Sequence, residues 1–370
     1  MERDRASVVS GKRARVLGLD VARAVAIFGM VFVNYKNAMN ARGGGPSWLL
    51  LLLDRFDGRA SVTFVTLAGM GAILLSEQAR ESNDPALRSA ARARVFKRAV
   101  FIFVLGLGLF RVWPGDILHF YGLYMATGAL LIYAPTYVYP LLALAALAIS
   151  IPMRFSLDHG AGYGPDHMWY LDFWSLAGFP RNLFYNGFHP YFPWIGFYLL
   201  GMWLARRILG NPERRARYLA VSVSVALAAE FGMRGWEQML WRMTSYAPAL
   251  RQSIMKWHAV MPSVFNFTAS QATAISVILI CLIICERRPD SRTVRALANT
   301  GQLALTHYLG HIILVLGPLL IFNQLEYIHP RLYSVAFALA YFAAAVLFSV
   351  AWRSRHAQGP LEWIMRRTAG

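Results

Sequence analysis

VLGLDVARAVAIFGMVFVNY, residues 16–35, is an apolar run of about the length that an α-helix needs to cross the hydrocarbon core of a bilayer. Nine further apolar runs of near-spanning length follow it. The sequence therefore predicts an all-α fold, a polytopic integral membrane helix bundle of about ten transmembrane helices. The predicted helices cover residues 16–35, 58–75, 99–112, 117–134, 139–153, 190–205, 217–234, 267–285, 298–322 and 332–352.

The distribution of lysine and arginine predicts how these helices are oriented. Of the 37 basic residues, 24 lie in five segments at alternate ends of the apolar runs, which are residues 3–15, 80–98, 206–217, 287–295 and 353–367. By the positive-inside rule these segments are cytoplasmic, so we expect both termini in the cytoplasm. The first run carries Asp20 and Arg23 and lacks a small-residue cleavage pattern, so we expect it to be retained as a membrane helix.

The chain is predicted to form one membrane domain, residues 16–352, between basic cytoplasmic tails at residues 1–15 and 353–370. Two long connections, residues 154–189 and 235–262, are expected on the outer side. Both are rich in aromatic side chains, and the first also in glycine and histidine. Aromatic rings at this level favour either a membrane-interface belt or a cap that faces a substrate.

The composition excludes a soluble protein and argues against a nucleic-acid partner. Hydrophobic residues make up 57% of the chain, charged residues only 15%, and the mean hydropathy is +0.41. The net charge of +18 resides largely in short loops between apolar runs, where attraction to anionic lipid accounts for it. We therefore predict the lipid bilayer, and no nucleic acid, as a partner.

Cysteine and histidine spacing gives no sign of a disulfide or a metal centre. Cys281 and Cys285 lie four residues apart within one apolar run, so we expect them to pack as small hydrophobic residues on one helix face. His307 and His311 have a spacing that metals use, but no third ligand lies nearby in the sequence. We expect no metal.

Charged or titratable side chains within apolar runs are candidate functional groups, because burying them in a bilayer costs free energy. Asp20 and Arg23 lie three residues apart near the cytoplasmic end of the first helix. Their spacing fits an internal ion pair, and it equally fits a binding surface for an anionic donor.

A second group is expected at the outer side. Asn34 ends the first helix, and Asp57 and Arg59 begin the second, so the three are expected to face each other across an outer pocket. For Asp57 the alternative is a helix cap. Arg59 is harder to explain as a cap, since a positive charge is unfavourable at a helix N-terminus.

Two groups contain histidine. Asp116 and His119 are three residues apart at the start of the fourth helix, and a carboxylate beside an imidazole fixes its tautomer and raises its basicity. His119 is therefore our leading candidate for a general base, with a capping Asp116 as the alternative. His307 and His311 share one face of the ninth helix, where they either line a cavity or bond to neighbouring helices.

Several blocks of sequence resemble one known family. They are LDVARAVAIFGMVFVNY (19–35), DGRASVTFVTLAGMG (57–71), WPGDILHFYG (113–122), HPYFPWIGFYLLGMWLAR (189–206), LALTHYLGH (303–311) and GPLEWIMRR (359–367). In order and placement they resemble the bacterial YeiB/DUF418 membrane family, which is itself similar to heparan-alpha-glucosaminide N-acetyltransferase. The resemblance covers nearly the whole chain.

This resemblance implies acyl transfer across the bacterial cytoplasmic membrane. The co-substrate would be acyl-CoA, most simply acetyl-CoA, and the acceptor a hydroxyl or amine of a small molecule or glycan at the outer side. The acetyltransferase relatives share the Asn34–Tyr35 pair but carry a catalytic histidine in the loop before the second helix. Residues 36–56 contain no histidine, so we expect His119 to take that role, Asn34 or Arg59 to stabilise the oxyanion, and Asp20 and Arg23 to bind CoA.

Two other functions are compatible with the same residues. A transporter or flippase for a small amphipathic substrate would line its path with these polar groups, although it would often show repeated halves and broken helices. A non-catalytic membrane partner would tolerate changes at His119, His307 or Asp57. The sequence does not determine the oligomeric state, and a homo-oligomer is one of the states compatible with it.

Overall fold

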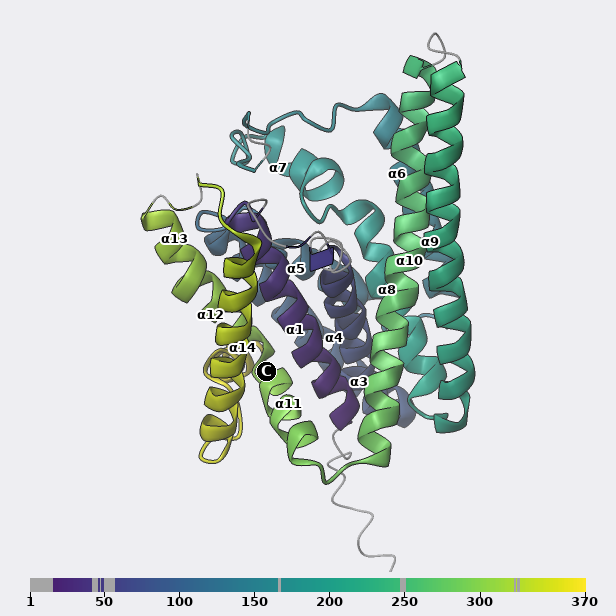
Figure 1. Ribbon diagram of the computed structural model, residues 1–370. Helices are drawn as coiled ribbons and strands as arrows, with labels where there is room; N and C mark the ends of the chain where they lie inside the picture. Colours follow the sequence, from purple (N-terminus) through teal and green to yellow (C-terminus); the bar gives the residue numbers. More distant parts are fainter. Residues whose placement is uncertain are drawn as a thin grey trace, which may run out of the picture.

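The computed structural model describes residues 16–41, 46, 48–49, 57–165, 168–246, 251–322, 324 and 327–370. In this part of the chain the regular structure is helical, as predicted, without a strand (Figure 1). The basic tail predicted at residues 1–15 lies outside the described residues. The elements are α1 (Leu17–Ala38), α3 (Arg59–Ser82), α4 (Pro85–Leu109), α5 (Leu118–Leu131), α6 (Val138–Ser156), α7 (Gly178–Arg181), η1 (Asn182–Asn186), α8 (Tyr191–Ile208), η2 (Pro212–Arg214), α9 (Arg215–Tyr246), α10 (Arg251–Arg287), α11 (Arg292–Gln302), α12 (Ala304–His311), η4 (Ile312–Leu316), α13 (Gly317–Ile321), α14 (Arg331–Arg353) and α15 (Pro360–Ala369).

Helix α1 is central to the bundle and packs against α3, α10, α11, α12 and α14. Figure 1 shows it between the α9–α10 pair on one side and α12–α14 on the other. We call the end of the bundle that carries α7 and α13 the upper end, and the end with the connection from α10 to α11 the lower end. Because α1 begins at the lower end, Asp20 lies there and Asn34 lies toward the upper end.

Glycines allow α3 and α8 to approach each other at backbone distance. A Cβ atom on Gly69 would lie 2.0 Å from the carbonyl oxygen of Tyr198, and one on Gly201 would lie 2.1 Å from the carbonyl oxygen of Thr66. Each helix therefore presents a glycine to the backbone of the other. We call this reciprocal contact the glycine seam. It holds the middle of α8 against α3 and so positions both helices beside the site described below.

The predicted outer connection at residues 154–189 is a folded segment at the upper end. The guanidinium of Arg181 donates to both carboxylate oxygens of Asp172 and to the hydroxyl of Tyr170, whose own hydroxyl donates to Asn186. Tyr163 and Tyr170 form an isolated β-bridge. These bonds give the segment a defined shape over the bundle.

The second predicted outer loop, residues 235–262, is instead largely helical. Residues 235–246 extend α9 and residues 251–262 extend α10, so the two helices form a long antiparallel hairpin that rises above the bundle in Figure 1. Aromatic residues there favour an outer connection, but helical structure propagates through the segment from two long helices that pack along each other.

The predicted ninth helix, residues 298–322, is broken. Helix α11 ends at Gln302, α12 begins at Ala304, and a π-helical turn, η4, separates α12 from α13. Pro318 lacks an N–H group to donate and its ring crowds the preceding turn, which explains irregular hydrogen bonding just before it. The interruption at Leu303, between α11 and α12, separates the lower part of the run from the part that carries both histidines.

Seven helices in the described part of the chain are long and apolar enough to cross a membrane. They are Leu17–Ala38, Arg59–Ser82, Val138–Ser156, Pro212–Trp236, Val264–Arg287, Ala304–Ile321 and Arg331–Arg353. The other three predicted spans coincide with α4, α5 and α8, which are helices of the same bundle. The total of ten spans and the cytoplasmic termini stay predictions.

Candidate functional site

The beginning of α5 brings Asp116 and His119 together in the protein interior. Both side chains are fully buried, and Nδ1 of His119 lies 3.2 Å from Oδ2 of Asp116. The same oxygen accepts hydrogen bonds from the backbone N–H groups of Leu118 at 2.9 Å and His119 at 3.4 Å. Asp116 thus accepts from free amides at the helix start and contacts the imidazole as well. The role of His119 as a general base stays a prediction.

Tyr308, from α12, completes this arrangement. Its hydroxyl donates to Oδ1 of Asp116 at 2.9 Å and accepts from the backbone N–H of Ile117 at 3.2 Å. The sequence analysis missed Tyr308. Its position beside His307, in a run of residues already singled out, was the available signal, but 192 residues separate it from Asp116.

The second ring nitrogen of His119 has no hydrogen-bond partner within the described structure. Nε2 is buried, and the ring packs against Phe120 at 3.9 Å, Phe110 at 5.5 Å and Phe173 at 5.8 Å between ring centroids. When Nδ1–H donates to Asp116, Nε2 carries the lone pair. The imidazole is therefore arranged to accept a proton at Nε2.

Close packing of α4 fixes the backbone at this point. A Cβ atom on Gly106 would lie 2.1 Å from the backbone nitrogen of His119, so only glycine allows α4 to lie this close to the start of α5. The position of the imidazole is consequently set by two elements, the first turn of α5 and the glycine face of α4.

Asn34 and His311 form a second contact near Tyr308. Nδ2 of Asn34 lies 2.9 Å from Nε2 of His311, and the ring of His311 lies 5.1 Å from that of Tyr308. The structure therefore brings Asp116, His119, Asn34 and His311 together in one group with Tyr308 between them, which we call the histidine network. All of its members are buried except Asn34, which is partly exposed. His307 faces the other way, with Nε2 2.6 Å from the hydroxyl of Ser349 on α14.

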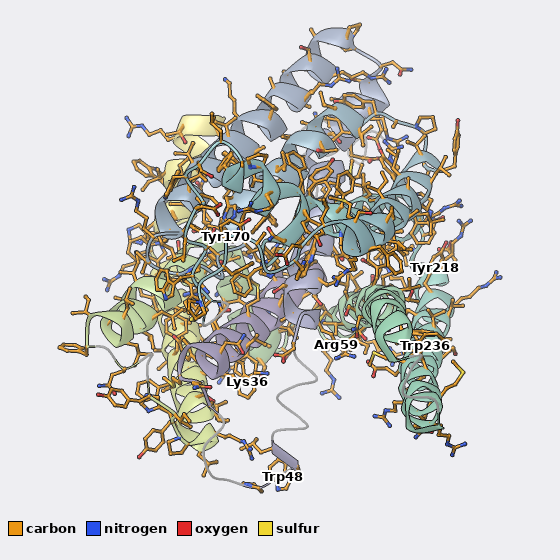
Figure 2. The ribbon with its side chains drawn as sticks, turned by 90° about the horizontal axis from the view of Figure 1, so that it is seen from above. Lys36, Trp48, Arg59, Tyr170, Tyr218 and Trp236 are labelled. Atoms are coloured by element: carbon orange, nitrogen blue, oxygen red, sulfur yellow. The ribbon has the colours of Figure 1, made fainter. Side chains whose placement is uncertain are left out.

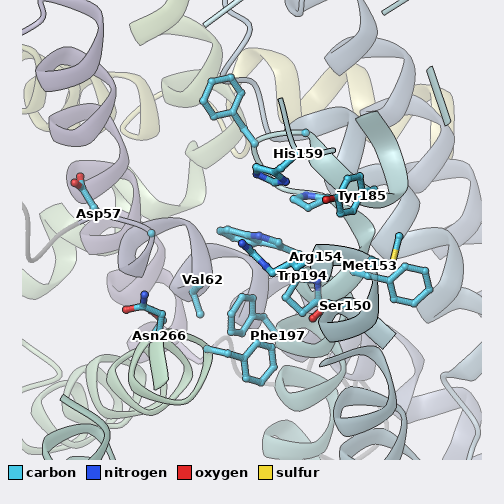
Figure 3. A pocket seen from close by; sticks show the side chains of 18 of the residues that line it. Asp57, Val62, Ser150, Met153, Arg154, His159, Tyr185, Trp194, Phe197 and Asn266 are labelled. Atoms are coloured by element: carbon cyan, nitrogen blue, oxygen red, sulfur yellow. The ribbon is translucent and has the colours of Figure 1, made fainter. Parts of the chain in front are cut away.

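Asp57 and Arg59 lie outside this network, on the wall of a cavity at the upper end (Figure 3). Lys36 donates to Asp57 at 2.5 Å, and Arg59 forms an ion pair with Glu230 of α9. Figure 2, seen from above, shows Arg59 beside the α9–α10 hairpin. The N-cap of α3 is Gly58, whose φ of +71° favours glycine.

The cavity has a volume of about 630 Å³. Its walls come from α3, α6, α8, α9 and α10 and from the segment between α6 and α8. They are Asp57, Gly58, Arg59, Val62, Ser150, Met153, Arg154, His159, Tyr185, Gly187, Phe188, Pro190, Phe192, Pro193, Trp194, Phe197, Met233, Asn266, Phe267 and Ser270.

One aromatic layer separates the cavity from the histidine network. Gly187 lies on the cavity wall, and a Cβ atom there would lie 2.5 Å from the ring of Phe120, which in turn covers His119. His189 belongs to the same layer, 4.5 Å from the wall residue Trp194. Burial, followed by the nearby His119, lowers the pKa of His189 to about 3, so its imidazole is neutral near neutral pH.

Asp20 and Arg23 lie at the opposite, lower end of α1. They form an ion pair, and Gln302 donates to the second oxygen of Asp20 at 3.1 Å. Asp20 is buried, whereas 26% of the Arg23 side chain is exposed. The predicted internal pair exists, and part of the Arg23 side chain stays exposed. Their role as a donor site stays a prediction.

Two family models match the chain. Residues 15–233 match the model described as heparan-alpha-glucosaminide N-acetyltransferase, catalytic, and residues 204–370 match a protein family of unknown function, DUF418. No curated protein matches the sequence significantly.

The first of these matches covers more than half of the chain, from α1 into α9, and includes Asp116, His119 and most of the cavity. It confirms the resemblance inferred from the sequence blocks. Together with the seven apolar helices it identifies an acetyltransferase-like, multi-pass membrane protein. The chain therefore belongs to the family defined by the catalytic domain of heparan-alpha-glucosaminide N-acetyltransferase.

Proposed function

We propose that this protein is a membrane-embedded acyltransferase that moves an acetyl group from cytoplasmic acetyl-CoA to a hydroxyl or amine at the outer side of the bacterial cytoplasmic membrane. The observation that carries the proposal is the buried pair of Asp116 and His119, in which Nδ1 is held and Nε2 has no partner. The membership in an acetyltransferase family supports the same reaction class.

In the proposed reaction His119 acts as the general base. Nε2 takes the proton from the acceptor hydroxyl or amine as that atom attacks the thioester carbonyl and a new C–O or C–N bond forms. The C–S bond then breaks, and the CoA sulfur leaves with the proton, so the products are the acetylated acceptor and CoA thiol. A positioned base typically contributes about 10²- to 10⁴-fold in rate.

Neighbouring groups of the histidine network have supporting roles in this proposal. Asp116 holds the tautomer of His119 and stabilises the imidazolium that forms. The amide of Asn34 has two N–H groups, and His311 takes up one of them, which leaves the other for the oxyanion. Because Phe120 separates His119 from the cavity, we expect the Phe120 ring to move when the acceptor enters.

The donor is proposed to bind at the lower end. Arg23 would contact a phosphate of CoA through its exposed side, while the buried Asp20, itself bonded by Gln302, holds the guanidinium in place. Asp20 and Asn34 are separated by fourteen residues of α1, or roughly 21 Å along the helix axis. The thioester arm would have to extend through the bundle over that distance.

The test is turnover of labelled acetyl-CoA by the purified full-length protein in detergent. We expect slow hydrolysis or transfer in the wild type, a loss of about 10²-fold or more in His119→Ala, and a higher KM in Arg23→Ala. His356→Ala is the matched control, since His356 is an exposed histidine outside the site. Full activity of folded His119→Ala would refute the role of His119.

A transporter is the second candidate, and the broken run α11–α13 favours it. Discontinuous helices line the binding sites of many transporters, and here the break lies next to His307. A protein that folds normally, binds no acetyl-CoA and yet moves an amphipathic substrate across liposomes would support this function over acyl transfer.

A further inference from the structure

The cavity at the upper end has two chemically different parts. One part is aromatic: Phe197 stacks on Phe267 with 4.3 Å between ring centroids, and Trp194 meets Phe197 edge to face at 5.2 Å. The other part carries Arg154 and His159, with Tyr185 beside them (Figure 3). A volume of about 630 Å³ is in the range of small-molecule sites.

The charges of the cavity do not cancel. Asp57 is paired with Lys36, and Arg59 is paired with Glu230. Arg154 forms neither a hydrogen bond nor an ion pair with any residue that the structure describes. Among the described residues the wall therefore carries one positive charge, at the end of α6, without an ion-pair partner. Asp158 is the carboxylate whose charge acts on the neighbouring His159.

His159 adds a hydrogen-bond donor beside this charge. Its ring lies 5.5 Å from that of Tyr185, and its pKa is lowered by burial and then by the positive charge of Arg154. A neutral imidazole next to a guanidinium is suited to an anion with several oxygen atoms, because both groups can donate to it.

The remaining walls suit a hydrocarbon chain. Met233 comes from α9, a helix of which only 11% of the apolar span is buried, so the hairpin that lines the cavity also borders the lipid. A ligand with a long chain would lie against the aromatic part of the cavity and approach it from the bilayer. A free sugar would leave this apolar surface unused.

We propose that this cavity binds an amphipathic phosphate, with the phosphate against Arg154 and His159 and the hydrocarbon chain against Trp194, Phe197 and Phe267. Resting on the acyltransferase function proposed above, this ligand is the carrier of the acceptor group. The acyl group would then be added to a lipid-linked molecule rather than to a free one.

The test is equilibrium binding of radiolabelled hexadecyl phosphate to the purified full-length protein. We expect saturable binding, with hexadecanol about tenfold weaker or more and inorganic phosphate unable to compete at millimolar concentration. Arg154→Gln should weaken binding about tenfold or more, and Arg154→Lys should retain most of it. Arg111→Gln is the control, since Arg111 lies over Trp174, away from the cavity, and should bind as the wild type does.

Three results would overturn the proposal. The first is an affinity for hexadecanol equal to that for hexadecyl phosphate. The second is competition by inorganic phosphate at concentrations as low as those of the lipid phosphate. The third is unchanged binding in an Arg154→Gln variant whose gel-filtration elution and melting temperature match those of the wild type. Saturable binding of the lipid phosphate by a wild-type protein that shows no acyl transfer would support the site and refute the acyltransferase function. The two proposals can therefore fail separately.

Discussion

Asp116 accepts hydrogen bonds from two backbone amides, one imidazole and one tyrosine hydroxyl. A buried carboxylate needs such a set of donors, because each unpaired oxygen in a low-dielectric interior costs free energy. Three of the four donors are within three residues in sequence, so the spacing of Asp116 and His119 was enough to predict their contact. Tyr308 depends on how α12 packs against α5, which no local pattern reveals.

Replacing Tyr308 by phenylalanine tests how much the most distant of the four donors to Asp116 contributes. The ring is kept, but Oδ1 of Asp116 loses its donor and the amide of Ile117 loses its acceptor. If Asp116 positions His119, we expect acyl transfer to fall about tenfold, mainly in kcat, with a changed pH profile. Tyr341→Phe, which removes a hydroxyl bonded to the backbone of His307, is the matched control. Equal kinetics in both variants would argue against the positioning role.

His189 makes the stability of the folded protein depend on pH in a defined direction. The folded-state pKa of about 3 lies below the ordinary value of 6.5, so the unfolded state takes up a proton first as the pH falls. Stability contributed by neutral His189 is present above pH 6.5 and is lost as the pH falls toward 3. Between pH 6.5 and pH 5 the loss is up to about 2 kcal/mol.

The measurement is thermal stability in detergent at pH 7, 6 and 5. His189→Phe keeps a ring beside Trp194 and cannot titrate, so its melting temperature should fall less on acidification than that of the wild type. Parallel decreases in the two proteins would show that His189 does not contribute to the acid sensitivity.

At the scale of elements, the ninth apolar run shows where the sequence pattern reaches its limit. Hydropathy predicts one helix over residues 298–322, because every part of the run is apolar enough. At the break at Leu303, the start of α12 is bonded by a residue near the C-terminal end of the chain. One carboxylate oxygen of Glu362, in α15, accepts from the amides of Leu305 and Thr306, and the other accepts from the Thr306 hydroxyl. The start of α12 is thus capped by a partner more than fifty residues away.

Removing this cap should destabilise the protein. Glu362→Ala leaves two helix N-terminal amides and a hydroxyl without their acceptor, and we expect a loss of about 1–3 kcal/mol of unfolding free energy. Glu362→Gln keeps one acceptor oxygen and should lose less. The comparison is made by thermal unfolding in one detergent. A glutamine variant as unstable as the alanine variant would show that the charge, rather than the acceptor geometry, stabilises α12.

At the scale of the molecule, the alternation of basic segments predicts which connections share a side of the membrane. Both native cysteines, Cys281 and Cys285, are buried, so introduced cysteines can be labelled against a low background. Leu176 is fully exposed at the upper end, and Ala86 is exposed in the first turn of α4, within the basic segment of residues 80–98.

We expect a membrane-impermeant maleimide to label Leu176→Cys in intact cells and to label Ala86→Cys only after the membrane is opened. The physical basis is the positive-inside rule, which assigns the arginine-rich connection to the cytoplasm. The opposite labelling pattern would show that the protein has the reverse orientation in the membrane, with the histidine network on the donor side.

The described fold agrees with the prediction from the sequence where the apolar pattern is long and regular. It differs where contacts between distant segments determine the structure. Apolar runs predicted the helices. The distant partners of the charged residues were not predictable, since Arg59 pairs with Glu230 and Gln302 donates to Asp20 across the bundle. The local pair of Asp20 and Arg23 was predicted from its spacing. The cavity was also beyond sequence analysis, because its walls come from five helices and a folded connection.

The glycine seam has a mechanical consequence. With backbone against backbone, α3 and α8 have no long side chains between them to change rotamer, so this joint resists sliding and bending. The opposite wall, where α9 packs mainly on α10 and otherwise borders lipid, is the compliant one. We expect the cavity to widen by displacement of the hairpin, so that the thickness and lateral pressure of the surrounding bilayer would regulate how readily a ligand enters.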